Sequence, residues 1–331
     1  MNRRDTVLAL LALGPLAVPL RALAQQSKRV FRVGFMYGRG RPTPSGPEVY
    51  LDAFTQKMRE LGYVDGVNLI VEWRYANGEY QRHPGHASEL ARLNVDVIVT
   101  SNLPSTLAAK HATSTIPIVF AAMVDPVGSG IVKSLARPEG NVTGFSLLSI
   151  DVVPKQVELL ASVIPKLSRI ACLLNPLVPV HKTFLTATQA AAQQIGATVL
   201  PVEAKNTEEI ERGFAAMAGW TAQAVTVPPD SFFTGQRSQI VQLALKNRIA
   251  TMLPYGADAE SGALLSYGPD LVDYYRNAAG YVGKILKGAK ISDLPVEQAI
   301  IFQFMVNMKT AKALGLKIPA VTLLRADKVI E

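Results

Sequence analysis

The sequence predicts an α/β protein made of two similarly built halves, each with a largely parallel sheet. In both halves, short apolar runs rich in β-branched residues alternate with amphipathic helical segments. This pattern is typical of parallel strands joined by helices. The alternation is interrupted over residues 137–154, which predicts a domain boundary near residues 144–150. A chain of 331 residues is long enough to form two medium-sized cores.

The first half begins with a short apolar run over 29–38, which we expect to be a buried strand ending near Tyr37. The segment 47–62 follows with apolar residues at helical spacing, and Gly62 is its expected stop. The later elements of this half are predicted from the same periodicities: strand 68–76, helix 83–93, strand 95–101, helix 104–112 and strand 116–122.

The second half repeats the scheme. Its expected elements are helix 154–165, strand 169–175, helix 181–195, strand 197–204, helix 207–218, strand 223–230, helix 236–247 and strand 249–255. Two further segments follow, a strand over 262–270 with a helix over 271–287, and an extended run over 294–315 that turns into a short helix. In a protein whose chain passes three times between its halves, these segments would be the second and third crossings. The alternative is that both extend the edge of the second sheet.

The N-terminal segment is expected to be a cleavable export signal over residues 1–24. A short basic start precedes an apolar stretch over 7–20, which ends on small residues up to Ala24. A membrane anchor is the alternative, but Pro15 and Pro19 leave too short an apolar stretch to span a bilayer. We therefore expect a soluble mature chain in the periplasm.

The composition excludes several classes of function. The formal net charge is +8 at pH 7, but no run of Lys and Arg stands out, so nucleic acid is not an expected partner. The single cysteine, Cys172, lies in an apolar run and is interpreted as a small core residue. The residues 128–130 (Gly-Ser-Gly) fail to extend into a dinucleotide-binding pattern. The pair His83 and His86 lacks a nearby acid and is interpreted as surface loop. We expect no cofactor, no metal and no catalytic residues.

Polar residues recur where the predicted strands end. In α/β proteins, ligands bind beyond the carboxyl ends of the strands. Hydroxyls and amides at a helix start suit a carboxylate, an aspartate suits an ammonium group, and a tyrosine suits a ring or a cation. Each residue alone is also explained as a helix cap or turn, and their recurrence in both halves favours a shared cleft. These strand-end residues are Tyr37, Ser101, Asn102, Asp125, Asn175, Asp230 and Tyr255.

Several blocks of the sequence, "DPVGSG", "NVTG" and "SYGPD" above all, closely resemble one family from about residue 29 to 331. It is the family of substrate-binding components of ABC importers, in the branch that includes tryptophan- and tyrosine-binding proteins. The resemblance implies the type I periplasmic-binding-protein fold, with two Rossmann-like lobes joined by a three-stranded hinge. The N-terminal lobe would hold residues 28–146 and about 266–298, and the C-terminal lobe 147–265 and about 299–331. Residues 128–135 would start a helix.

The resemblance also implies a function and a site. The protein would close on a small polar ligand, an amino acid (an aromatic one included) or a related carboxylate, and deliver it to an ABC permease and its ATPase. It would act as a monomer. Alternatives are an enzyme on the same scaffold, processing glycosyl or nucleotide substrates, and a sensor for a membrane receptor. Expected ligand contacts are Ser101, Asn102, Asp125, Ser146, Asn175, Asp230 and Tyr255, with Tyr37 as a stacking face.

Overall fold

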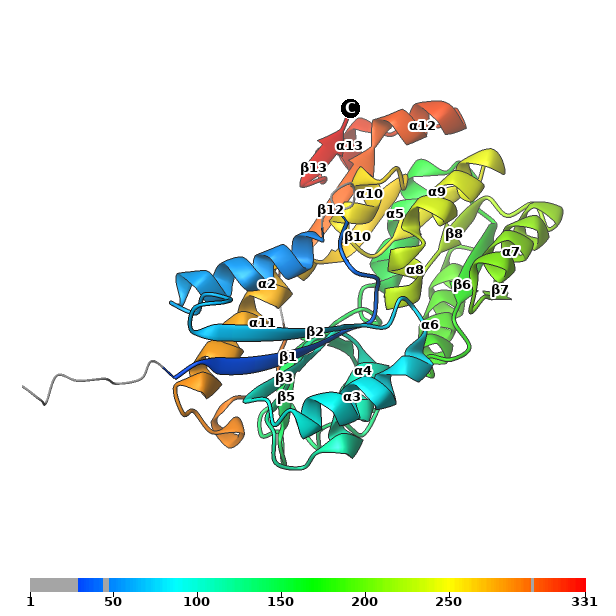
Figure 1. Cartoon of the computed structure of the whole chain (residues 1–331). Coiled ribbons are helices and arrows are strands. Elements are labelled where there is room, and N and C mark those ends of the chain that lie inside the picture. Colours follow the sequence, from blue (N-terminus) through cyan, green and yellow to red (C-terminus); the bar gives the residue numbers. More distant parts are fainter. Residues whose placement is uncertain (1–28, 44–47, 299–300) are drawn as a thin grey trace, which may run out of the picture.

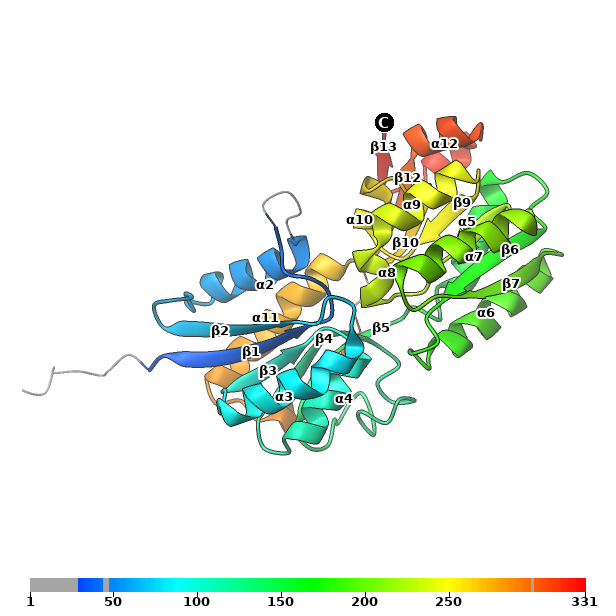
Figure 2. The same ribbon diagram turned by 45° about the vertical axis from the view of Figure 1, so that its right-hand side comes forward.

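The computed structural model describes residues 29–43, 48–298 and 301–331. The predicted export signal over residues 1–24 lies outside this part. The described chain forms two α/β lobes, each with a central sheet flanked by helices (Figures 1 and 2). Over the described ranges, no helix has the length and apolar character needed to cross a membrane.

The first lobe is built on a parallel sheet. Within the described residues it has six strands in the order β11-β5-β4-β3-β1-β2. The strands are β1 (Phe31–Tyr37), β2 (Leu69–Tyr75), β3 (Val97–Thr100), β4 (Ile118–Val124), β5 (Val142–Leu147) and β11 (Glu297–Gln298). β1 lies between β3 and the edge strand β2, and it pairs in parallel with β2 from Phe31↔Leu69 to Tyr37↔Tyr75. All of these strands therefore end at the same edge of the sheet.

Helices cover both faces of this sheet. Helices α2 (Val49–Glu60) and α11 (Leu271–Leu286) pack together on one face, around an aromatic core that includes Phe35, Phe54 and Tyr274. Helices α3 (His83–Arg92) and α4 (Leu103–Ala112) cover the other face, where Leu90 and Ala109 contact Ile98 and Phe120. Short 3₁₀ turns lie at η1 (Tyr80–Arg82) and η2 (Ile291–Asp293).

The second lobe has a mixed sheet in the order β13-β12-β10-β9-β8-β6-β7 within the described residues. Among the described strand pairs of this sheet, β10 and β12 form the one antiparallel pair. The strands are β6 (Arg169–Leu174), β7 (Thr198–Glu203), β8 (Ala224–Thr226), β9 (Ala250–Leu253), β10 (Leu265–Pro269), β12 (Phe302–Asn307) and β13 (Lys328–Ile330).

The helices of the second lobe also form two layers. One layer packs on the face that holds Cys172, and it contains α5 (Val153–Val163), α6 (His181–Gln194), α12 (Met308–Leu314) and α13 (Ala320–Leu323). Helices α7 (Thr207–Gly219) and α9 (Arg237–Lys246) cover the opposite face. Two short helices, α8 (Ser231–Gly235) and α10 (Gly256–Glu260), directly follow strand ends.

The chain passes between the lobes three times, after β5, after β10 and after β11. The structure differs from the expected lobe limits at two points: Leu147 still belongs to β5 of the first sheet, and the second difference is at β10. β10 is hydrogen-bonded to β9 and β12 in the second sheet, so the return to the first lobe begins at Leu271 and not near residue 266. We therefore propose lobe limits of 29–147 with 271–298, and 153–269 with 302–330.

Two local predictions are wrong. Residues 128–135 form turns and bends and not the start of a helix, because the turn after Asp125 closes at Gly130, which has a positive φ of 70°, and the Ile131 N–H bonds back to the Pro126 carbonyl at 3.0 Å. The His83 and His86 segment is not a surface loop: it forms the first turn of α3, and His83 is fully buried against the ring of Tyr80.

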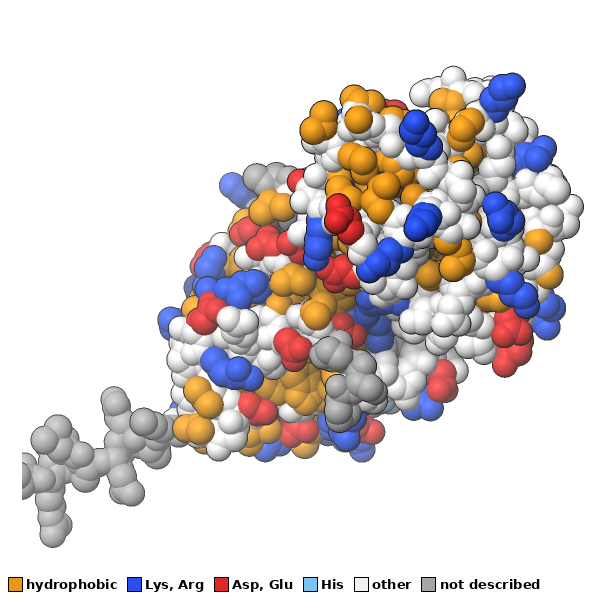
Figure 3. Space-filling model, turned by 90° about the horizontal axis from the view of Figure 1, so that it is seen from above, with side chains coloured by type: hydrophobic (Ala, Val, Ile, Leu, Met, Phe, Trp, Pro, Cys, Tyr) orange, Lys and Arg blue, Asp and Glu red, His pale blue; other side chains and the backbone are white. Residues whose placement is uncertain are grey.

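On the face of the molecule shown in Figure 3, basic and acidic side chains are interspersed.

Candidate functional site

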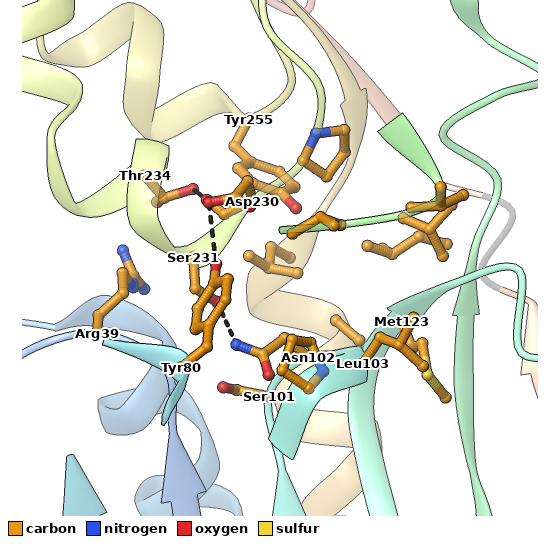
Figure 4. A pocket seen from close by; sticks show the side chains of 18 of the residues that line it. Arg39, Tyr80, Ser101, Asn102, Leu103, Met123, Asp230, Ser231, Thr234 and Tyr255 are labelled. Carbon is orange, nitrogen blue, oxygen red and sulfur yellow. Dashed lines mark hydrogen bonds between the residues drawn. The ribbon is translucent and has the colours of Figure 1, made fainter. Parts of the chain in front are cut away.

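A cavity lies between the two lobes, at the carboxyl ends of their strands (Figure 4). The empty space between its walls is about 630 Å³, which includes open solvent at its mouth. Side chains from both lobes form its wall. The first lobe contributes Arg39, Tyr80, Ser101, Asn102, Leu103, Pro104, Ala122, Met123, Val124, Leu147, Leu271 and Tyr275, and the second contributes Val178, Val180, Pro229, Asp230, Ser231, Thr234 and Tyr255.

Direct hydrogen bonds join the lobes across this cavity. The Tyr80 hydroxyl donates to Asp230 Oδ1 at 3.0 Å, and Asn102 Nδ2 donates to Ser231 Oγ at 3.0 Å (Figure 4). Gly38 lies beside this contact, because a Cβ atom at that position would clash with the Asn102 amide of the same lobe and lie 2.8 Å from the Ser231 side chain of the other. The lobes are therefore in contact, as in a closed form.

Asp230 is the centre of the second lobe's side of the cavity. It is the N-cap of α8, and its Oδ1 atom accepts hydrogen bonds from the N–H groups of Phe232 and Phe233 at 2.7 and 3.0 Å. Its Oδ2 atom accepts a hydrogen bond from Asn175 Nδ2 at 3.3 Å and lies 3.9 Å from His181 Nε2. Burial lowers the pKa of His181, so a neutral imidazole stands beside the carboxylate.

Ser101 and Asn102 lie at the start of α4, where the sequence predicted a carboxylate site. In the structure, Ser101 Oγ accepts a hydrogen bond from the Gly38 N–H at 2.9 Å. Asn102 forms a capping box with Ser105, accepting from its N–H at 2.9 Å, and Pro104 has no N–H to offer. Protein groups therefore already form hydrogen bonds with much of the polar surface at the start of α4.

Arg39 and Tyr37 occupy the end of β1. Tyr37 is 1% exposed and lies in the core, where its hydroxyl accepts a hydrogen bond from Arg39 Nη2. The same nitrogen donates to Glu48 Oε1 at 2.7 Å. Burial acts to lower the pKa of Arg39, but Tyr37 and Glu48 outweigh it and hold the pKa above its ordinary value. The Arg39 guanidinium thus stays positively charged on the cavity wall, and Tyr37 lies behind it.

The eight predicted site residues fall into three groups. Four of them line the main cavity: Ser101, Asn102, Asp230 and Tyr255. Asp125 and Ser146 line a neighbouring hollow, and Asp125 caps its own turn there. Tyr37 and Asn175 do not line the cavity, and they support Arg39 and Asp230 from behind.

Sequence reasoning missed five polar residues of the wall: Arg39, Tyr80, Ser231, Thr234 and Tyr275. Ser231 and Thr234 could have been inferred as the first turn of a helix capped by Asp230. Tyr80 carries no local signal, because its role depends on the opposite lobe. In the part of the chain that the structure describes, no group of three or more His, Cys, Asp and Glu side chains is arranged to hold a metal ion.

The chain resembles known proteins over most of its length. The family model for ABC transporter substrate binding proteins matches residues 47–330. A tyrosine-binding protein of Clostridioides difficile (strain R20291) is 28% identical over 265 residues, which cover 80% of this chain and 76% of that protein.

Solved structures agree with this match. The structure of an ABC domain in complex with L-Trp from Streptococcus pneumonia has a TM-score of 0.82 at 26% identity, covering 91% of this chain and 100% of that chain. A conserved domain protein from Vibrio cholerae has a TM-score of 0.83 at 27% identity, with the same coverage. The ligand-free, open structure of a substrate binding protein from Clostridium difficile scores only 0.64 at 27% identity, covering 91% and 99%. The chain belongs to the family of ABC transporter substrate-binding proteins.

Proposed function

We propose that this chain is the periplasmic substrate-binding component of an ABC importer and that its ligand is an amino acid with an apolar or aromatic side chain. After export it acts as a monomer and hands its ligand to a permease driven by an ATPase. No covalent chemistry is part of this function. The names of the relatives, a tyrosine-binding protein and an L-Trp complex, support an amino acid as the ligand class.

The observation that carries the proposal is the uneven polarity of the interlobe cavity. Arg39, Tyr80 and Ser231 lie toward one end of the close-up view, and Met123 lies toward the other (Figure 4). The remaining apolar lining residues come from several loops and strands of both lobes: Ala122, Val124, Leu147, Val178, Val180 and Leu271. A small molecule with a charged head and an apolar tail matches such a cavity.

The mechanism is closure. A ligand that contacts both lobes at once binds the closed form better than the open form, and so shifts the population toward closure. The direct bonds from Tyr80 and Asn102 to the second lobe form only when the lobes meet. The closed shape is then the signal that a permease can recognise.

A thermal-shift screen against the common amino acids and aromatic acids tests the proposal, with calorimetry on every compound that raises the melting temperature. We expect at least one amino acid to bind with a Kd well below millimolar, and X-ray scattering to show a more compact particle with that ligand. If no compound of this panel binds below millimolar, or if the protein converts a ligand to a product, the proposal is wrong. Mass spectrometry of the exported protein checks cleavage near Ala24.

A further inference from the structure

Arg39 is a buried cation on the cavity wall whose hydrogen-bonding capacity is only partly used. The residue is 8% exposed, and its Nη2 atom donates to the Tyr37 hydroxyl and to Glu48 Oε1. A guanidinium carries five N–H donors. Among the residues that the structure describes, no acceptor pairs with the Nε–H or the two Nη1–H groups, so these three donors are left for a ligand.

The guanidinium is also held in one orientation. It lies over the rings of Tyr50 and Tyr37, at 4.9 and 5.1 Å from their centroids. The backbone carbonyl of Arg39 accepts a hydrogen bond from the Asn77 N–H at 3.2 Å. Glu48 pairs with Arg39 but does not line the cavity. A guanidinium ordered in this way suits an anion such as a carboxylate, to which its Nε–H and Nη1–H groups can donate single charge-assisted hydrogen bonds.

The other expected position for a carboxylate is less suitable. The hydroxyl of Ser101 and the amide of Asn102 already bond to Gly38, Ser105 and Ser231. A ligand carboxylate at the start of α4 would have to displace these contacts. At Arg39 it would displace none of those that the structure shows, because the free donors lie on other nitrogens.

The opposite charge comes from the second lobe. Asp230 also lines the cavity, and among the described residues one donor, Asn175 Nδ2, bonds to its Oδ2 atom. A carboxylate oxygen has room for a second donor, and a ligand ammonium group can supply it. Each lobe thus offers one charge, a cation from the first and an anion from the second.

We propose that Arg39 determines specificity by binding the carboxylate of the ligand, while Asp230 binds its ammonium group, so that only a zwitterionic α-amino acid bridges the lobes by both charges. This inference rests on the proposed function and deepens it. It predicts that an amine or an acid with the same side chain binds more weakly than the amino acid, because each engages only one lobe by charge.

Calorimetry with a matched set of probes tests the inference. The probes are L-tyrosine and L-tryptophan, the amines tyramine and tryptamine, and the acid 3-(4-hydroxyphenyl)propanoate. We expect the amines and the acid to bind the unchanged protein at least tenfold more weakly than the amino acids. Arg39→Gln should weaken amino-acid binding by about 10–100-fold and leave the affinity for the amines within about threefold. Arg39→Lys keeps the charge without the planar fork and should recover part of the loss.

Arg41→Gln is the control, since Arg41 is exposed, lies over the Tyr75 ring and does not line the cavity. It should bind all probes as the unchanged protein does. If Arg39→Gln keeps full affinity for the amino acids, or loses amines and amino acids equally, the inference is wrong. If Arg39→Gln does not fold, an undiminished affinity in Arg39→Lys overturns it. Failure of the unchanged protein to bind any amino acid would instead refute the proposed function, and the inference with it.

Discussion

Removing the Tyr80 hydroxyl tests whether direct bonds between the lobes stabilise the closed form. This hydroxyl donates to Asp230 at 3.0 Å and accepts from the Phe232 N–H at 3.2 Å, and both partners belong to the second lobe. Burial first, and the neighbouring Asp230 second, raise the pKa of Tyr80 well above its ordinary value, so it remains a neutral donor. The variant Tyr80→Phe removes both bonds and keeps the ring that packs against His83, 5.9 Å away.

The expected loss of binding free energy in Tyr80→Phe depends on the hydrogen bonds that Asp230 keeps. A hydrogen bond to a charged group contributes about 1.5–3 kcal/mol. Asp230 retains its bonds from the N–H groups of Phe232 and Phe233, so we expect a loss near the lower limit, about 1.5 kcal/mol. The bonds exist only in the closed form. The loss therefore appears as a roughly tenfold weaker apparent affinity, with little change in the unfolding temperature of the ligand-free protein.

Calorimetry with the best-binding amino acid measures this effect, and Tyr281→Phe is its control. The Tyr281 hydroxyl is bonded within the first lobe, to the Pro295 carbonyl at 2.8 Å and to Glu297 Oε1 at 2.6 Å. Its removal should lower the free energy of unfolding without changing the affinity. Unchanged affinity in Tyr80→Phe, or an equal loss of affinity in both variants, would refute the reasoning.

Three further predictions follow from single contacts. Gly38→Ala places a methyl group against the Asn102 amide of its own lobe, which donates to Ser231, and 2.8 Å from the Ser231 side chain of the other lobe. Calorimetry should show about 5–100-fold weaker binding, for an overpacking cost of about 1–3 kcal/mol. Burial lowers the pKa of His83 from 6.5 to about 4, so between these pH values the unfolded chain binds a proton at this residue and the folded chain does not. The free energy of unfolding should therefore fall by up to about 3 kcal/mol as the pH drops from 6.5 to 4. Urea titrations should find a smaller pH dependence in His83→Phe. Asp125→Ala removes the cap on the Gly128 N–H and should lower stability by about 1 kcal/mol, whereas a more than threefold change in ligand affinity would place Asp125 in the site.

The sequence predicted most of the fold and about half of the candidate site, for one reason. Strand and helix periodicities are local, and parallel strands necessarily end at a common edge of their sheet. Residues directly after a strand, such as Ser101, Asn102 and Asp230, could therefore be placed near a cleft without knowledge of any long-range contact.

The residues that were missed or misread depend on contacts between distant segments. Arg39 lies in a glycine-rich loop without periodicity, and its burial results from the rings of Tyr37 and Tyr50. Tyr80 gains its role from Asp230, 150 residues away. The expected helix after residue 128 was wrong because the left-handed backbone of Gly130 closes the chain into a single turn, with the Ile131 N–H bonded to the Pro126 carbonyl. The apolar residues of this short segment do not reveal that turn.

The three passages of the chain between the lobes have a consequence for how the protein is synthesised. The aromatic core of the first lobe needs α11, and its sheet is completed by β11. Both elements leave the ribosome after nearly all of the second lobe. A chain that lacks the residues up to Gln298 therefore leaves apolar strand faces of the first lobe uncovered, so that lobe can fold stably only once α11 and β11 are available to it.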